Sequence, residues 1–196
     1  AITLHREIPV EAEIIMQDTI AAMYDKGKAA VVVVDNEVKT ADGEPLWTTR
    51  SSLFIRGEGG WGGDRGPSGA INEPPADRAP DHETTLATSP DQAFVYRLSG
   101  DRNPLHTDPS FAALGGFDRP ILHGLCTYGF TGRALLHSLC AGQSANFGHM
   151  EGRFASPVLP GEELTVRIWR TADGEAVFTT AVGDRTVIDQ GLCRFA

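Results

Sequence analysis

Residues 96–106 read YRLSGDRNPLH, and the rest of the chain is interpreted outward from this segment. Six consecutive residues of it hold an acid, an amide and an imidazole, namely Asp101, Asn103 and His106. Gly100 is predicted to end a helix, because glycine readily takes the left-handed conformation that follows helices. Pro104 fixes its own φ and disfavours helix at the residue before it. The segment is therefore predicted to be a rigid turn that directs its three polar side chains to one point.

Two interpretations of this turn follow from its residue types. An aspartate and a histidine held together can activate a water molecule and move a proton, while an asparagine holds either partner or the water in place. Alternatively, Asp101 and Asn103 only form turns beside a helix end, and His106 is a loop histidine bonded to the backbone. The spacing alone favours the second interpretation, because Asx-Pro turns are common.

Three helices are predicted around the turn. Residues 89–92, SPDQ, combine an N-cap serine, a proline at the first helical position and a capping-box glutamine, and this helix is predicted to run to Ser99. Residues 108–109, Asp-Pro, start a second short helix by the same logic. The longest helix is predicted over residues 123–141, which corresponds to a length of about 28 Å.

The segments on either side of these helices are rich in β-forming residues. Strands are predicted at residues 13–23, 29–34, 38–40, 46–56, 164–169, 176–182 and 187–195. Residues 57–83 interrupt the pattern, with seven glycines between Gly57 and Gly69 and four prolines by Pro80. An irregular stretch of this length is usually a linker or a functional loop, so we predict that it crosses between two halves of the chain.

Short similarities between the two halves predict a duplicated unit. The sequence GKAAV at residues 27–31 resembles GEAVF at residues 174–178. We divide the chain into a first, incomplete repeat at 1–56, a linker at 57–83 and a second repeat at 84–196. The first repeat has no predicted helix, either because it has diverged or because its helix lies upstream of Ala1. We favour the second explanation, since a sheet needs something to cover its apolar face.

Composition narrows the class of protein. A net charge of −9 and a pI near 5.1 argue against nucleic acid as a partner, which usually requires a basic face. No apolar run reaches the roughly 18–20 residues of a membrane helix, so no membrane partner is expected. The three cysteines have no CxxC spacing and are predicted to be free thiols in a reducing compartment.

Residues 96–106, together with Ala112 and the sequence GFDRPILHG at residues 116–124, resemble the signature of the MaoC-like dehydratases and (R)-specific type-two 2-enoyl-CoA hydratases. A weaker similarity covers nearly all of the chain. The resemblance implies an α+β, double hot-dog fold, in which an antiparallel sheet wraps around a long central helix. The first repeat would be non-catalytic, would lack its N-terminal helix here, and would make room for a bulky acyl tail.

The resemblance also implies roles for individual residues. Asp101 and His106 would be the catalytic acid–base pair, and Asn103 would orient that site. Gly124 would form the oxyanion hole, which suits a glycine at a helix N-terminus, where free N–H groups favour developing negative charge. The expected substrate-binding residues are Lys26, Arg102, Pro104, Leu105 and Phe154. Alternatives stay open for two of them: Phe154 as a core aromatic and Lys26 as a surface lysine.

The implied activity is that of a hydro-lyase of fatty-acid metabolism, the reversible hydration of trans-2-enoyl-CoA to (3R)-3-hydroxyacyl-CoA. The expected partner is an acyl-CoA, which is substrate rather than cofactor, and no metal or redox cofactor is required. A homodimer is expected as the usual symmetric assembly. The expected location is the cytoplasm of a bacterium, or the peroxisome in a eukaryote.

Three other functions are considered. The first is a dehydratase acting on carrier-protein thioesters in fatty-acid or polyketide synthesis. The second is a non-catalytic acyl-thioester binding module, which the intact set of Asp, Asn and His disfavours. The third is a metal site built from Asp101, His106, Asp108 and His123, which is disfavoured because the sequence has no HExxH or similar ligand spacing.

Overall fold

The computed structural model describes residues 1–196 as one antiparallel sheet of nine strands with three α-helices. The strands are β1 (Ile2–Leu4), β2 (Ile14–Asp25), β3 (Ala29–Thr40), β4 (Pro45–Arg56), β5 (His82–Ala87), β6 (Phe147–Phe154), β7 (Glu163–Ala172), β8 (Glu175–Val182) and β9 (Arg185–Phe195). Their order in the sheet is β2-β3-β4-β1-β6-β9-β8-β7-β5. The helices are α1 (Gln92–Tyr96), α2 (Pro109–Leu114) and α3 (Gly124–Leu139), and none is long and apolar enough to span a membrane.

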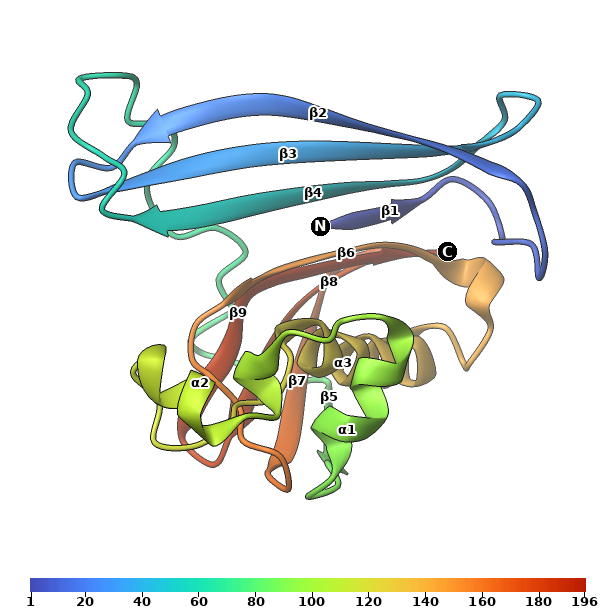
Figure 1. Ribbon diagram of the computed structural model, residues 1–196. Helices are drawn as coiled ribbons and strands as arrows, with labels where there is room; N and C mark the ends of the chain where they lie inside the picture. Colours follow the sequence, from blue (N-terminus) through green and yellow to red (C-terminus); the bar gives the residue numbers. More distant parts are fainter.

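Helix α3 is held in the curved part of the sheet. Figure 1 shows it beneath β6, β8 and β9, with β7 and β5 curving around it. Its buried side chains recur every three or four residues and are Cys126, Thr127, Thr131, Ala134, Leu135 and Leu139. Leu135 packs in one cluster with Met150, Phe178 and Ile188, all at most 1% exposed. Burying a side chain of this size stabilises the folded state by roughly 1.5–3 kcal/mol. The long helix wrapped by an antiparallel sheet confirms the expected hot-dog architecture.

The short strand β1 joins the two halves of the sheet. It pairs with β4 on one side and with β6 on the other, so that Ile2 lies opposite both Thr49 and Met150. Outward from this junction, β4, β3 and β2 on one side match β9, β8 and β7 on the other. The turns of the outer hairpins contain Gly27 and Gly174, whose φ angles are both positive, at 82° and 68°. Residues 27–31 and 174–178, which are similar in sequence, thus lie at corresponding hairpin turns in the two halves of the sheet.

The predicted helix starts need one correction. The helix expected from Ser89 begins at Gln92 instead, because the Ser89 hydroxyl accepts a hydrogen bond from the Asp91 N–H and forms a turn. The Gln92 side chain does accept from the Ser89 N–H, so half of the capping box is present. The last residues before Gly100 form a 3₁₀ turn, and the φ of 114° at Gly100 confirms the predicted end.

The other predicted elements are close to those observed. Asp108 caps α2 by accepting from two backbone N–H groups, as expected, and α3 begins and ends within two residues of the prediction. The linker was predicted to extend to residue 83, but β5 already starts at His82. This edge strand has no strong apolar pattern of its own, and its pairing with β7 defines it.

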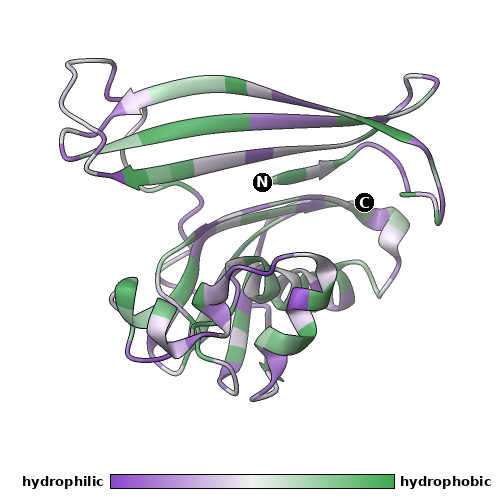
Figure 2. Cartoon of the chain, viewed as in Figure 1, coloured by the Kyte–Doolittle hydropathy of each residue, from purple (hydrophilic) through white to green (hydrophobic).

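The first half of the sheet has an open apolar face, as the sequence led us to expect. Ile2 packs against the cluster around α3, and residues that are paired across an antiparallel sheet point to the same face. Thr49 is paired with Ile2, so the face of β2–β4 on which Thr49 lies is continuous with the side of the sheet that covers α3. The apolar side chains on it that are between 40% and 64% exposed are Ile14, Met16, Ile20, Met23, Leu53 and Ile55. No helix lies within residues 1–91, and Figure 2 shows the apolar stretches of β3 and β4 on this open part of the sheet.

The three cysteines are buried free thiols, as predicted. Burial raises the pKa of Cys126 to about 11 and that of Cys193 to about 12. Because the thiolate is the reactive form, these residues are packing groups in the core.

The buried carboxylate of Asp25 anchors the glycine-rich linker. Its oxygens accept hydrogen bonds from the N–H groups of Gly27, Gly60 and Gly62 at 2.7, 2.8 and 2.7 Å. The Asp25 side of the β2–β3 turn is thereby tied to the start of the linker. These hydrogen bonds lower the pKa of Asp25, because they stabilise the charged form.

Asp25→Asn is predicted to lower the melting temperature at pH 7 by several degrees, because the amide loses the charge that the three N–H groups stabilise. A carboxyl whose pKa is lowered by folding stabilises the fold fully above its unfolded pKa of about 4, and this stabilisation is lost as the pH falls further. The gap in melting temperature between wild type and variant should therefore narrow as the pH is lowered from 5 to 3. Differential scanning calorimetry checks this, with Asp77→Asn in the same linker as control. A gap that does not change with pH would contradict the account.

Candidate active site

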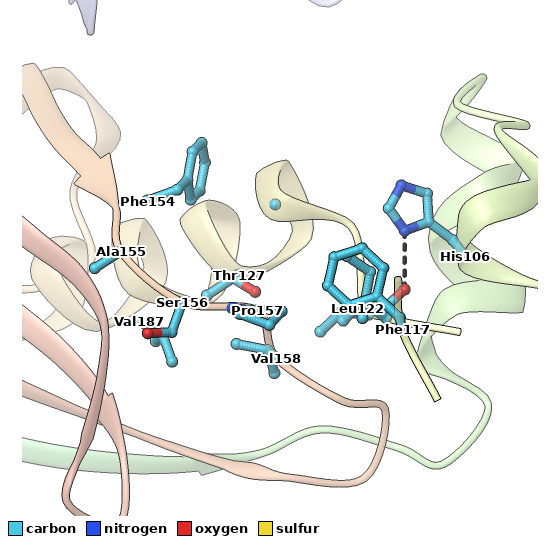
Figure 3. A pocket seen from close by; sticks show the side chains of 12 residues that line it. His106, Phe117, Leu122, Thr127, Phe154, Ala155, Ser156, Pro157, Val158 and Val187 are labelled. Atoms are coloured by element: carbon cyan, nitrogen blue, oxygen red, sulfur yellow. Dashed lines mark hydrogen bonds between the residues drawn. The ribbon is translucent and has the colours of Figure 1, made fainter. Parts of the chain in front are cut away.

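A cavity of about 300 Å³ opens at the N-terminus of α3. It is lined by His106, Phe117, Ile121, Leu122, Gly124, Thr127, Phe154, Ala155, Ser156, Pro157, Val158 and Val187. Figure 3 shows His106 and Phe154 on opposite sides of it, with Thr127, Pro157 and Val158 between them. The lining is mostly apolar with a few polar groups, as is usual for a small-molecule site.

The turn at residues 100–106 is built by side chain-to-backbone hydrogen bonds. The Asp101 carboxylate accepts from the Asn103 N–H at 3.1 Å, and the Asn103 side-chain oxygen accepts from the Leu105 N–H at 3.0 Å. Both residues are thus turn formers, as one of the two interpretations held. The result is a 3₁₀ turn at Pro104–His106 that leaves Asp101 exposed and places His106 at the cavity.

His106 is 8% exposed, and its Nδ1 lies 2.8 Å from the carbonyl oxygen of Ile121 (Figure 3). A carbonyl can only accept, so the neutral ring carries its proton on Nδ1 and keeps the Nε2 lone pair. An imidazole in this state can act as a general base through Nε2.

A second histidine, His123, completes the cluster. It is 1% exposed and stacks on His106 with ring centroids 3.8 Å apart. Its Nε2 lies 3.2 Å from the carbonyl oxygen of Asp101, while its Nδ1 has no partner. Burial, and then the neighbouring His106, lower the pKa of His123. Sequence reasoning considered this residue only as a metal ligand, although its place directly before Gly124 in the signature was a signal.

Asp101, His106 and His123 also have the residue types of a metal site, with potential ligand atoms within 4.8 Å of one another. Their arrangement does not fit one well. The two imidazoles are stacked with an angle of 28° between their planes, so their in-plane lone pairs do not converge on one point. In each ring, one nitrogen is also hydrogen-bonded to a backbone carbonyl oxygen and is not free to bind a metal. The fourth proposed ligand, Asp108, is engaged in capping α2.

Gly124 lies at the first position of α3 and beside Phe154. Its N–H has no hydrogen-bond acceptor within the protein, as expected for the first turn of a helix. A Cβ at this position would lie 3.3 Å from the ring of Phe154, so glycine leaves room that any other residue would fill. Phe154 is 52% exposed, which argues against its being a core aromatic.

The cavity gathers some of the predicted site residues and not others. His106, Gly124 and Phe154 line it, and the Asp101 carboxylate lies within 4.8 Å of a ring nitrogen of His106 without lining the cavity. Four residues predicted to bind substrate do not line it: Lys26, Arg102, Pro104 and Leu105. The ammonium of Lys26 donates to the carbonyl oxygen of Pro67 at 3.0 Å and so fastens the linker. The wall residues Thr127 and Val187 were not predicted, because nothing in their local sequence distinguishes them from core residues. Phe117 was not predicted either, although it lies within the signature at residues 116–124.

Two family models match the chain. One, described as MaoC like domain, matches residues 72–191, and the other, MFE-2 hydratase 2 N-terminal domain, matches residues 1–57. Among curated proteins, an enoyl-CoA hydratase of Mycobacterium tuberculosis is 47% identical over 173 residues, covering 87% of this chain and 59% of that protein. The 3-hydroxyacyl-thioester dehydratase Y of the same organism is 45% identical over 204 residues, covering 99% of this chain and 70% of that protein. The chain thus spans 59% and 70% of the length of these two relatives.

Solved structures agree with the fold. A MaoC-like dehydratase from Phytophthora capsici superposes with a TM-score of 0.92 at 35% identity, covering all of this chain and 69% of that one. The full-length peroxisomal multifunctional enzyme type 2 of Drosophila melanogaster gives a TM-score of 0.89 at 36% identity, covering all of this chain and 36% of that one.

The two stacked imidazoles are predicted to be opposite tautomers when both are neutral. His106 should carry its proton on Nδ1 and His123 on Nε2, because each of these nitrogens faces a carbonyl oxygen. Long-range ¹H–¹⁵N NMR correlation spectra distinguish the two forms directly. A protonated Nε2 on neutral His106 would contradict the assignment and remove the lone pair on which its role as a base depends.

Proposed function

Because the chain belongs to the MaoC-like dehydratase family, we propose that it catalyses the reversible hydration of trans-2-enoyl-CoA to (3R)-3-hydroxyacyl-CoA. The observation that carries the proposal is that one apolar cavity is lined both by His106, which has Asp101 beside it, and by a helix N-terminus with a free N–H. The relatives named as enoyl-CoA hydratase and hydroxyacyl-thioester dehydratase perform this chemistry in one direction or the other, which supports the assignment.

In this proposal the acid–base pair holds the attacking water. The Nε2 lone pair of His106 and the carboxylate of Asp101 accept hydrogen bonds from the water, whose oxygen forms a bond to C3 of the substrate. As the oxygen bonds to C3, the water gives up one proton to Nε2 of His106 and the π bond between C2 and C3 breaks. The His106 imidazolium then returns that proton to C2. The product gains one water in total, so no oxidant or reductant is consumed.

Gly124 has the role of stabilising the charge that develops on the thioester. During addition, electron density moves onto the carbonyl oxygen as an enolate-like species. The free N–H of Gly124 and the positive end of the α3 dipole favour that charge more strongly in the transition state than in the substrate. Asn103 acts indirectly, because its side-chain oxygen is used to build the turn that carries His106.

The proposal also specifies the group that carries the acyl thioester. We assign coenzyme A, as in the name of the first hydratase relative, while the name of the second relative leaves carrier-protein thioesters as the alternative. Comparing kcat/KM on enoyl-CoA and on the matching enoyl-carrier protein separates the two. Lys26, on the linker side of the sheet, stays a proposed contact to the carrier phosphates. A homodimeric assembly and a bacterial cytoplasmic location also remain proposals.

Asp101→Asn and His106→Ala are each predicted to lower kcat by about 10²–10⁴-fold, the usual loss when a general acid–base group is removed. Neither residue belongs to the main apolar cluster around Leu135, so the variants should fold. The loss of enoyl-thioester absorbance measures the rate, and circular dichroism checks the fold.

Two exposed residues of the same types serve as controls for these variants. Asp184 lies in the β8–β9 turn, and His137 lies on the exposed side of α3. The variants Asp184→Asn and His137→Ala should both keep the wild-type rate. A folded Asp101 or His106 variant with wild-type activity would remove the assigned pair from the mechanism.

A further inference from the structure

His123 contacts both members of the proposed acid–base pair without lining the cavity itself. It is the residue immediately before α3 and is 1% exposed. One of its nitrogens is bonded to the backbone of Asp101, and its ring is stacked on the ring of His106. The Tyr96 ring, 4.8 Å away, completes its surroundings.

The bond to Asp101 fixes a segment that little else holds. Residues 101–103 are exposed, and apart from hydrogen bonds inside the turn, the 3.2 Å bond from the His123 Nε2–H to the Asp101 carbonyl oxygen is the only hydrogen bond that ties them to another part of the chain. Gly100, with a φ of 114°, precedes them and leaves the backbone freedom to move. The Asn103 N–H orients the Asp101 carboxylate within the turn, and His123 ties the backbone of the turn to the start of α3.

The stack with His106 requires a neutral partner ring. A proton that His106 takes up during the reaction would meet repulsion from a second imidazolium 3.8 Å away. The other charged or titratable groups around His123 are Tyr96 on α1, Arg97 and Asp101. Its buried Nδ1 has no acceptor for a second proton, so burial holds the ring neutral and agrees with its lowered pKa.

A purely structural role explains these contacts less well. An unpartnered ring nitrogen in a buried place costs free energy that a phenylalanine of similar shape would not. The imidazole adds only one thing that phenylalanine cannot supply, which is the N–H bond to Asp101.

We propose that His123 is a positioning residue that holds the backbone of Asp101 and the ring of His106 in one arrangement for catalysis. This role rests on the proposed hydratase function. It predicts that the bond to Asp101 and the stack on His106 contribute separately to kcat, while substrate affinity, which depends on the cavity walls, is unaffected.

Two substitutions in the purified protein separate the two contacts. His123→Phe keeps a stacked ring and removes the donor, and should lower kcat by about 10²-fold, the loss expected from misplacing a reacting group by about 1 Å. His123→Gln keeps an N–H donor at similar reach but removes the stacked ring, and should lower kcat measurably, by no more than roughly tenfold. KM should change by less than about twofold in both, since neither alters the cavity lining.

His149→Phe is the matched control, because His149 on β6 is another largely buried histidine, with its Nδ1 2.8 Å from the Thr3 hydroxyl, and lies in neither the cavity nor the cluster. It should keep the wild-type kcat and KM. If His123→Phe does not fold, His123→Gln alone decides: a lower kcat at unchanged KM supports the role, and an unchanged kcat overturns it.

The outcomes also distinguish this inference from the function on which it rests. A folded His123→Phe protein with the wild-type kcat, beside an inactive Asp101→Asn protein, overturns the positioning role and leaves the hydratase function standing. A change confined to KM overturns it as well. A wild-type protein without hydratase activity overturns both.

Discussion

The position of helix α3 in the curved half of the sheet is the constraint on which the rest of the site depends. Its buried side chains, with Leu135 at their centre, fix the helix against β6, β8 and β9. The start of the helix is thereby placed at the cavity, where Gly124 offers a free N–H and His123 reaches both the turn at Asp101 and the ring of His106. The packing of α3 in the core therefore also determines the geometry of the site.

The sequence predicted the site where local chemistry determines the structure. Gly100 and Pro104 act through their own backbone, and Asp108 acts through hydrogen bonds to the residues that follow it, so the turn and the helices beside it could be inferred residue by residue. The stacking of His106 on His123 could not, because these residues are brought together by α3 and its surroundings rather than by their spacing. The same holds for β1 and β5, short strands that are defined by their neighbours in the sheet.

The two halves of the sheet differ in what covers them. The second half encloses α3, whereas the corresponding face of β2–β4 is apolar and exposed, and the linker is fastened to this half by Asp25 and Lys26. The resemblance implies that Lys26 binds substrate, and in the structure its ammonium donates a hydrogen bond to the linker backbone. Its local sequence, an exposed turn, carries no information about that distant carbonyl.

The central claim is that the cavity at the start of α3 hydrates an enoyl thioester with (3R) stereochemistry. It is tested most directly by adding the purified protein to crotonyl-CoA and to a longer trans-2-enoyl-CoA, following the absorbance of the conjugated thioester, and resolving the product on a chiral column. The account predicts that the absorbance falls and that the alcohol is the (3R) enantiomer. Unchanged absorbance with folded protein, or a (3S) product, would contradict it.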